Sequence, residues 1–347
     1  MSERRSDDLP EAASWRWWVN GALVEPGEAV VSAGDAGVQH AVGVFTTMRA
    51  WPSGGGAGDG GAGEEALVEG EREGVVWRLD RHVERVVGSM VELGMAAEGE
   101  AAGLRGELRT AVEACVAGNG LGAARLRLTV TPGSVTLRPP GREKGAGASR
   151  GSAGGGGRTV LVEPSPVTAY DPAYFERGVR VVVHGPGANP FDDHAGHKTV
   201  NYWSRLSSLR RAAEAGAAEA IWLNVTNHLA SGAISNLFVV KDGVLRTPIA
   251  RGEEVQGALR APVLPGVVRG AVIEWAEGQG IEVERRMLTV EDLLDADEVF
   301  LTNSGWLVLP VSGVEQKEIG SGAVGDVTRR VRAGLAGMIA AETGVGG

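Results

Sequence analysis

Residues 197–203 read HKTVNYW and place a lysine, Lys198, between a strand-like stretch and the start of a helix. Apolar side chains at helical spacing predict that helix from Tyr202 to Ala213. A side chain at such a junction can project into a cleft between domains. Lysine is usually a solvated surface charge, but only four of the 34 basic residues are lysines, and the other three lie in predicted turns or loops. We therefore single out Lys198 as a candidate reactive amine.

Strand and helix patterns extend outward from this lysine in both directions. Downstream, ISNLFVVKDGVLRTP (234–248) predicts a hairpin turned at Asp242-Gly243, and LPGVVRG (264–270) opens a helix. EVFLTNSGWLVLPV (298–311) predicts two more strands. Upstream, the spacing within 77–95 predicts a helix. The pattern as a whole is typical of an α+β fold.

The length of 347 residues suits two hydrophobic cores rather than one. We expect a small N-terminal α/β domain over residues 1–168, an interdomain connection over 169–178 and a larger domain over 179–347. Glycine-rich stretches at 52–63 and 141–157 contain few apolar side chains, so we expect flexible insertions there.

Composition limits the partners and the compartment. A formal net charge of -10 argues against a nucleic acid or an anionic membrane, because both require a basic surface. A single cysteine, Cys115, cannot form an intrachain disulfide, which favours a reducing cytoplasm. No apolar run approaches the length of a membrane helix, and the first residues lack a secretory signal pattern. We expect a soluble cytoplasmic protein with a small-molecule ligand.

Two other kinds of site are weaker interpretations. The glycine-rich stretches lack the GK[ST] ending of a phosphate loop. His194 and His197 lie near Asp192 and Asp193, but no second cluster has the spacing of metal ligands. We expect these four side chains to line a cleft, and we expect no metal.

The order of HKTVNY, ISNLFVVKDGVLRTP, LPGVVRG and EVFLTNSGWLVLPV resembles the class IV aminotransferases. These fold type IV pyridoxal-phosphate enzymes include branched-chain and D-amino-acid aminotransferases and 4-amino-4-deoxychorismate lyases. WVNGALV (18–24), VFTTMRA (44–50) and residues 77–95 are similar to the small domain of that family. The resemblance implies pyridoxal 5'-phosphate as cofactor, a larger domain with a barrel-like sheet, and a homodimer.

The resemblance also implies roles for individual residues. Lys198 matches the lysine that holds the cofactor as a Schiff base and moves protons at the substrate Cα. Arg78 matches the arginine that binds the cofactor phosphate, a task suited to a planar guanidinium. A helix start and a turn would supply further phosphate contacts, and a tyrosine would lie near the cofactor ring. These further residues are Gly266, Val267, Val268, Asn303, Ser304 and Tyr202.

Departures from the family pattern bear on the reaction. Ser231 stands where the family usually has a glutamate that pairs with the pyridine nitrogen, and a serine cannot neutralise a protonated nitrogen. Val268 stands at a common threonine position, Thr46 at a glutamate position and His40 at a frequent tyrosine position. We expect His40, Thr46 and Gly305 to line the substrate pocket.

Three functions stay open at this point. A transaminase would move an amino group between an amino acid and a 2-oxo acid through Lys198. A lyase would eliminate at Cβ and give 4-aminobenzoate and pyruvate; the TNSGWLVLPV segment (302–311) and Ser231 favour it, whereas an RGxGxRGY-like segment typical of the lyases is missing. A cofactor-binding protein with impaired catalysis is the third possibility. We favour the transaminase.

Overall fold

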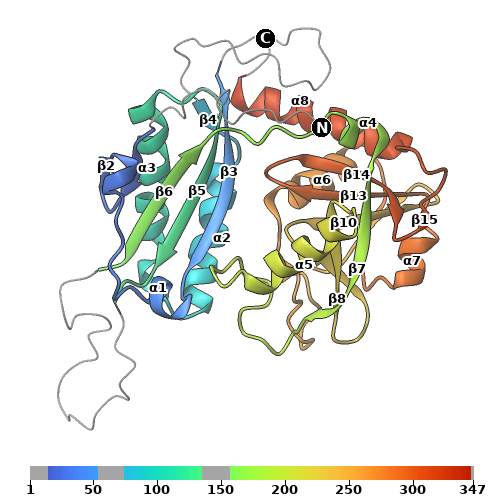
Figure 1. Cartoon of the computed structure of the whole chain (residues 1–347), viewed down its shortest axis with the longest axis horizontal. Helices are drawn as coiled ribbons and strands as arrows, with labels where there is room; N and C mark the ends of the chain where they lie inside the picture. Colours follow the sequence, from blue (N-terminus) through green and yellow to red (C-terminus); the bar gives the residue numbers. More distant parts are fainter. Residues whose placement is uncertain (1–14, 54–73, 135–156, 345–347) are drawn as a thin grey trace.

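The computed structural model describes residues 15–53, 74–134 and 157–344, which form two β-sheets with helices around them (Figure 1). This α+β arrangement confirms the predicted fold class. Most of each glycine-rich stretch, residues 54–63 and 141–156, lies outside the described residues.

The first sheet has six strands in the order β2-β1-β6-β5-β3-β4, all paired antiparallel. Its strands are β1 (Trp17–Val19), β2 (Ala22–Val24), β3 (Val44–Pro52), β4 (Gly74–Val76), β5 (Ala124–Thr131) and β6 (Thr159–Ser165). The hairpin between β1 and β2 turns at Asn20 and Gly21, whose φ angles of 47° and 102° explain the Asn-Gly pair.

Alternation along β5 separates the two faces of this sheet. Leu126, Leu128 and Val130 are fully buried in the first core, whereas Arg125 and Arg127 project from the opposite face. The core face is covered by α2 (Leu79–Glu92) and α3 (Ala101–Asn119), which lie behind the strands in Figure 1. Short elements complete this part of the chain: η1 (Pro26–Glu28), α1 (Ala36–His40) and η2 (Glu98–Glu100).

The second sheet is mixed and has nine strands, in the order β12-β11-β10-β13-β14-β7-β8-β9 with β15 on β14. They are β7 (Val179–Ala188), β8 (Glu219–Asn224), β9 (Leu229–Gly232), β10 (Asn236–Lys241), β11 (Val244–Thr247), β12 (Val283–Arg285), β13 (Glu298–Asn303), β14 (Leu307–Val314) and β15 (Lys317–Glu318). Strand β7 runs parallel to both β8 and β14, and β10, β13 and β14 pair antiparallel.

Five helices accompany the second sheet: α4 (Ala173–Arg177), α5 (Trp203–Glu214), α6 (Val267–Gly278), α7 (Val290–Leu294) and α8 (Asp326–Thr343). Helices α6 and α8 cover one face, where the stacked rings of Phe238 and Phe300 lie 5.0 Å apart in the core. Among the described helices, none has both the length and the apolar character required to cross a membrane.

The two sheets use strands on either side of the predicted connection. Strand β6 ends at Ser165, β7 begins at Val179, and α4 lies between them with Phe175 packed against the second sheet. The division into domains at 169–178 stays a prediction.

Candidate active site

The backbone places Lys198 where the two sheets meet. The N–H of Phe45 donates to the carbonyl of Lys198 at 2.8 Å, and the N–H of Val200 donates to the carbonyl of Gly43 at 3.0 Å. Thr199 thereby forms a β-bridge with Val44 at the start of β3. Figure 1 shows the chain ahead of α5 reaching across to the first sheet. The lysine is therefore held by both parts of the molecule.

The Lys198 amine is partly buried among aromatic rings. Its Nζ donates a hydrogen bond to the Tyr202 hydroxyl at 3.2 Å and lies 4.6 Å from the centre of the Phe45 ring. Tyr202 meets Phe45 edge-on, with ring centres 5.2 Å apart. Burial lowers the pKa of Lys198 well below its ordinary value, and four guanidinium groups lower it further. A neutral amine of this kind is a nucleophile and a proton acceptor near pH 7.

The four guanidinium groups that act on the Lys198 pKa come from three elements. Arg85 lies on α2, Arg125 and Arg127 lie on β5, and Arg205 lies on α5. They surround the amine with positive charge in a protein whose net charge is -10. The site therefore favours anionic ligands.

Arg85 joins β3 to the start of α6. Its Nη2 donates to Thr46 Oγ1 at 2.8 Å, and its Nη1 donates to the Pro265 carbonyl at 3.3 Å. Burial lowers its pKa to about 10, so the side chain remains a cation at neutral pH. Its Nε is buried and has no hydrogen-bond partner in the described part of the chain. A buried donor without a partner destabilises the folded protein. We therefore interpret Arg85 as a cation that binds an anionic ligand.

The start of α6 supplies further donors beside Arg85. Gly266 is the N-cap and no side chain caps the helix, so the first N–H groups are free to bind a ligand. Asn236 fixes the approach to the helix, since its Nδ2 donates to the Leu264 carbonyl at 2.8 Å. A Cβ at Gly266 would collide with the Asn236 amide, which explains the glycine. The predicted residues Gly266, Val267 and Val268 thus form a helix start next to Arg85.

The turn after β13 lies beside this helix start. Asn303 Oδ1 accepts hydrogen bonds from the N–H groups of Gly305 at 2.8 Å and Trp306 at 3.0 Å. A Cβ at Gly305 would lie 2.8 Å from the Tyr170 hydroxyl, so glycine fits this turn. Thr302, just before this turn, pairs with Asn236 of β10, and Asn236 donates to the Leu264 carbonyl ahead of α6, so the turn and the start of α6 lie close to the same residue. The predicted residues Asn303 and Ser304 are therefore brought to the same side of the site as Gly266.

Ser231 lies on the other side of the site, in β9. It is buried, with 4% of its surface exposed, and pairs with Trp222 of β8. The Arg205 guanidinium stacks over Trp222 at 4.8 Å and donates to the carbonyls of Gly232 at 3.3 Å and Ala233 at 2.8 Å. Cross-strand neighbours share a face, so Ser231 and Arg205 lie on the same side of the sheet.

A buried carboxylate, Glu219, holds the chain that follows β9. Glu219 accepts hydrogen bonds from the N–H groups of Ala233 at 3.0 Å and Ile234 at 3.1 Å and from Ser235 Oγ at 3.0 Å. Burial raises its pKa, and these donors oppose that shift. Both oxygens are engaged by the protein, so we interpret Glu219 as a support for residues 232–235.

Arg78 lies away from this group. Its guanidinium forms ion pairs with Glu274 of α6 at 2.7 Å and Glu342 of α8 at 2.8 Å. Two carboxylates already form ion pairs with this side chain. Arg85, about two helical turns further along, lies among the cations that act on the Lys198 pKa. The phosphate role of Arg78 stays a prediction, and Arg85 is the better placed candidate for it.

His40 and Thr46, which the sequence predicts to line the substrate pocket, lie at the two ends of the segment that leads into β3. His40 is exposed at the end of α1 and makes no hydrogen bond to another predicted site residue in the described ranges. Thr46 is fully buried between β3 and α2, where its Oγ1 lies 2.8 Å from His82 Nδ1. Thr46 Oγ1 also accepts a hydrogen bond from Arg85 Nη2 at 2.8 Å.

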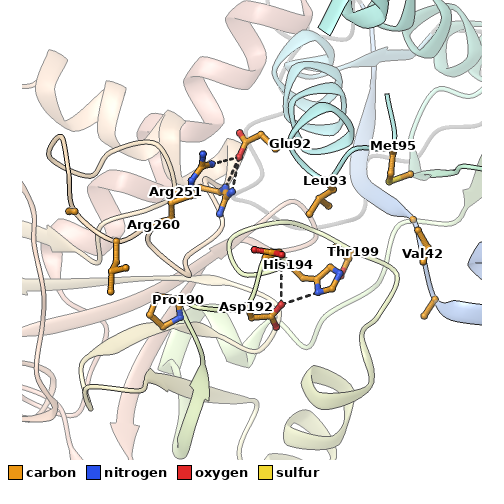
Figure 2. A pocket seen from close by; sticks show the side chains of 15 residues that line it. Val42, Glu92, Leu93, Met95, Pro190, Asp192, His194, Thr199, Arg251 and Arg260 are labelled. Carbon is orange, nitrogen blue, oxygen red and sulfur yellow. Dashed lines mark hydrogen bonds and ion pairs between the residues drawn. The ribbon is translucent and has the colours of Figure 1, made fainter. Parts of the chain in front are cut away.

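A cavity of about 620 Å³ lies on the Thr199 side of the Lys198 segment (Figure 2). Glu92 at its edge contacts Arg251 at 2.7 Å and Arg260 at 2.6 Å. His194 bonds to Asp192 in the same cavity, as a cleft-lining pair. Within the described ranges, no three potential metal ligands cluster together. Lys198 does not line this cavity, so we do not place the chemistry there.

Sequence reasoning missed five residues that the structure brings to Lys198: Phe45, Arg85, Arg125, Arg127 and Arg205. The two arginines of β5 alternate with core leucines, so their shared face was readable from ARLRLTV (124–130). The choice of Arg85 over Arg78 needed the three-dimensional position of α6.

The chain is similar to known proteins in both sequence and structure. The family model for amino-transferase class IV matches residues 43–314. The chain belongs to the class IV aminotransferase family. This class IV protein is 29% identical over 334 residues to the branched-chain-amino-acid aminotransferase of Escherichia coli strain K12, covering 94% of this chain and 93% of that one.

Solved structures of class IV proteins share the fold. The Escherichia coli branched-chain amino acid aminotransferase superposes with a TM-score of 0.74 at 27% identity, covering 96% of both chains. A second branched-chain amino acid aminotransferase, from T.th. and solved with pyridoxamine 5'-phosphate, has a TM-score of 0.74 at 26% identity over the same share of both chains. The 4-amino-4-deoxychorismate lyase of Pseudomonas aeruginosa has a TM-score of 0.67 at 25% identity, covering 94% of this chain and 99% of that one.

Proposed function

We propose that this protein is a pyridoxal 5'-phosphate-dependent transaminase that moves an amino group between an amino acid and a 2-oxo acid. One observation carries the proposal: the Lys198 amine has a strongly lowered pKa and lies in one site with Arg85, a half-buried cation of α2 that has no ion pair among the described residues and contacts Pro265 just ahead of α6. Similarity to named aminotransferases over more than nine-tenths of the chain supports it.

The described residues fit the cofactor. Arg85, with its unpartnered Nε, and the uncapped N–H groups of Val267 and Val268 would hold a phosphate, and Ser304 Oγ would add a hydroxyl. Lys198 would bind the aldehyde carbon, and Tyr202 and Ser231 would lie at the ring. When bound, pyridoxal phosphate supplies an electron-withdrawing ring that stabilises negative charge at the substrate Cα.

The protein's own side chains accept the proton of the substrate Cα and orient the group that takes it. Burial and neighbouring cations lower the pKa of Lys198 and so favour the neutral amine, the form that accepts the proton of the substrate Cα. Tyr202 orients the amine through the 3.2 Å hydrogen bond. Phe45, which contacts both side chains, excludes water from the amine.

A lyase of the aminodeoxychorismate type is the second candidate. Ser231 favours it, since a serine cannot neutralise a protonated ring nitrogen and the cofactor would be a weaker electron sink. The described residues also offer the cation Arg205 on the same side of the sheet as Ser231, which would disfavour that proton further. We retain the transaminase as the first proposal.

Homodimerisation is also part of the proposal. Large apolar side chains such as Trp203 and Val255 are each 79% exposed, which is typical of surfaces that bind a partner.

The proposal is tested with purified protein and added pyridoxal phosphate. We expect an absorbance band at roughly 400–430 nm, and borohydride should fix the cofactor to the peptide that contains Lys198. The variant Lys198→Ala should show neither signal. A panel of L- and D-amino acids with 2-oxo acids tests amino transfer, and pyruvate release from aminodeoxychorismate tests the lyase. A colourless protein with nothing fixed at Lys198 contradicts both enzymes.

A further inference from the structure

His197 directly precedes Lys198, and the two side chains contact different elements. The His197 side chain is 3% exposed, and its Nδ1 lies 2.9 Å from Ser89 Oγ of α2. The Lys198 amine contacts Tyr202 and the Phe45 ring instead. The residue ahead of the reactive lysine therefore anchors this segment to α2.

Ser89 shares one face of α2 with Arg85. The two residues are four positions apart in the helix, so their side chains lie one turn apart on its surface. Both line a cavity of about 310 Å³, together with His197 and Pro265. The hydrogen bond between His197 and Ser89 thus joins the segment that carries the amine to the helix that carries the candidate phosphate cation.

Three contacts hold the Lys198 segment, β3 and α2 to one another. Two backbone hydrogen bonds pair the segment with the start of β3. The hydrogen bond from Arg85 to Thr46 ties α2 to β3. The hydrogen bond between His197 and Ser89 is the third contact and links the segment to α2. The position of the amine relative to Arg85 therefore depends on this third contact as well as on the first two.

The imidazole of His197 is neutral at pH 7. Burial first, then the charge of Arg251, lowers its pKa to about 4 against the opposing charge of Glu92. Its Nε2 is buried, has no hydrogen bond within the described ranges and lies 3.7 Å from Glu92 Oε2. A buried nitrogen without a hydrogen bond destabilises the folded state, and an apolar ring would avoid that cost. The contact with Ser89 is therefore what a histidine provides at this position.

Pyridoxal phosphate carries its aldehyde and its phosphate arm on neighbouring ring carbons, so a protein must hold an amine and a phosphate cation at a matching separation. A displacement of about 1 Å already impairs a reaction of this kind. We propose that His197 is a positioning residue: its hydrogen bond to Ser89 fixes the separation between the Lys198 amine and the Arg85 guanidinium, and so aligns the amine with the aldehyde carbon. This inference rests on the proposed function for the cofactor.

Two ligands separate positioning from folding. Pyridoxal 5'-phosphate needs both the phosphate site and an aligned amine, whereas pyridoxamine 5'-phosphate has no aldehyde and does not join Lys198. The Kd of each is measured on the full-length chain freed of cofactor, by absorbance titration for the first ligand and by calorimetry for the second. Loss of alignment raises the first Kd alone, whereas a disturbed fold or phosphate site raises both.

Three variants change the contact itself. Ser89→Ala and His197→Phe each remove the hydrogen bond, and the second keeps a ring of similar size. We expect each to raise the ratio of the pyridoxal phosphate Kd to the pyridoxamine phosphate Kd about tenfold, the effect of one lost hydrogen bond. The double variant should match either single variant, because both changes remove one contact. His197→Asn keeps a polar group at the position of Nδ1 and should stay close to the wild-type ratio.

His228→Phe is the matched control. The Nδ1 of His228 also lies 3.0 Å from a hydroxyl, that of Thr226, but this pair lies in the turn between β8 and β9. The control should keep the wild-type Kd for both ligands. Ser89→Ala makes the smallest change, so it decides the test if His197→Phe does not fold.

The outcomes separate this inference from the proposed function. If the wild type binds both ligands and the Ser89 and His197 variants leave the ratio unchanged, or raise both Kd values equally, His197 does not position the amine and the proposed function stands. If the ratio rises as expected but no amino acid is a donor, the positioning role stands and the transaminase is wrong. If the wild type binds neither ligand, both are wrong.

Discussion

Arg85 Nη2 donates a 2.8 Å hydrogen bond to Thr46 Oγ1, and this contact ties α2 to β3 beneath the candidate phosphate site. The same hydroxyl lies 2.8 Å from His82 Nδ1. Burial first, and the charges of Arg85 and Lys198 next, lower the pKa of His82, so its imidazole is neutral. Thr46 therefore accepts from Arg85 and donates to His82. A residue at a family glutamate position thus positions a cation without neutralising it.

Replacing Thr46 with valine tests this positioning role. The variant Thr46→Val keeps the side-chain shape but leaves buried groups of Arg85 and His82 without a partner. We expect a loss of about 1–3 kcal/mol in the free energy of unfolding, measured in urea. We also expect about tenfold weaker binding of pyridoxal phosphate, measured by absorbance titration. Thr110→Val changes an exposed side chain of α3 and should keep the wild-type cofactor affinity; equal losses in both variants would remove the positioning role.

Arg85 and Arg78 form a matched pair for the phosphate role. We expect Arg85→Gln to weaken binding of pyridoxal phosphate about 10- to 100-fold, because a buried charge-assisted contact is lost. Arg78→Gln should leave that affinity unchanged and should lower the free energy of unfolding by about 1 kcal/mol, since its carboxylate partners are partly solvated. The reverse result would restore the phosphate role to Arg78.

Arg78 and Arg85 also show what the sequence could and could not predict. Periodicity predicted the helix that carries both residues, and alternation predicted the strands of both sheets, because each pattern records which face is buried. The choice between Arg78 and Arg85 depends on where α6 begins relative to α2. That relation arises from contacts far apart in the sequence, such as Arg85 with Pro265.

The group of arginines around Lys198 could not be predicted from the sequence for the same reason. Arg125, Arg127 and Arg205 read as ordinary polar positions on a strand and a helix. Only the pairing of residues 198–200 with the start of β3 brings them to one lysine. The role of Glu219 could not be predicted from the sequence either, because it accepts from the backbone N–H groups of Ala233 and Ile234 and from the Ser235 hydroxyl, which fold close to it.

Ser231 offers a test of the reaction type. Under the proposed function Ser231 lies at the ring nitrogen, so Ser231→Glu would supply a carboxylate there, beside Arg205. We expect faster amino transfer and a shift in the absorbance of the bound cofactor, because a protonated ring is a stronger electron sink. Ser231→Ala is the control and should keep the wild-type spectrum. If the two variants behave alike, Ser231 does not lie at the ring nitrogen.

The lowered pKa of His197 predicts that the folded protein loses free energy of unfolding in acid. Its Nδ1 lies 2.9 Å from Ser89 Oγ, and burial first, then the charge of Arg251, lowers its pKa to about 4, against the opposing charge of Glu92. Below pH 6.5 the unfolded chain binds a proton that the folded chain rejects, so stability falls as the pH falls toward 4. Linkage gives a loss of about 2 kcal/mol between about pH 7 and about pH 5 from this residue.

Urea unfolding at several pH values measures this loss. His197→Asn should be less stable than the wild type at neutral pH but should lose less stability on acidification. His40→Gln changes an exposed side chain and should follow the wild-type pH dependence. Parallel pH profiles for all three proteins would show that His197 is not the group responsible.

Glu92 links the two parts of the chain that meet at Lys198, so replacing it tests how strongly they are held together. It lies at the end of α2 and contacts Arg251 at 2.7 Å and Arg260 at 2.6 Å, both from the second part of the chain (Figure 2). Burial alone would raise the pKa of Glu92, but the hydrogen bond and charge of Arg251 lower it, so the contact persists until strongly acidic pH. Glu92→Gln should remove about 1 kcal/mol, since the carboxylate is 42% exposed and water screens the pair.

The more sensitive measurement for Glu92→Gln is hydrogen exchange at Phe45 and Val200, whose N–H groups pair the Lys198 segment with β3. If Glu92 holds the two sheets against each other, these amides exchange faster in the variant, while amides within α3 do not. Glu84→Gln, on the exposed side of α2, is the control because its pair with Arg81 stays within that helix. Unchanged exchange at Phe45 and Val200 would mean that the backbone bridge alone holds the lysine in place.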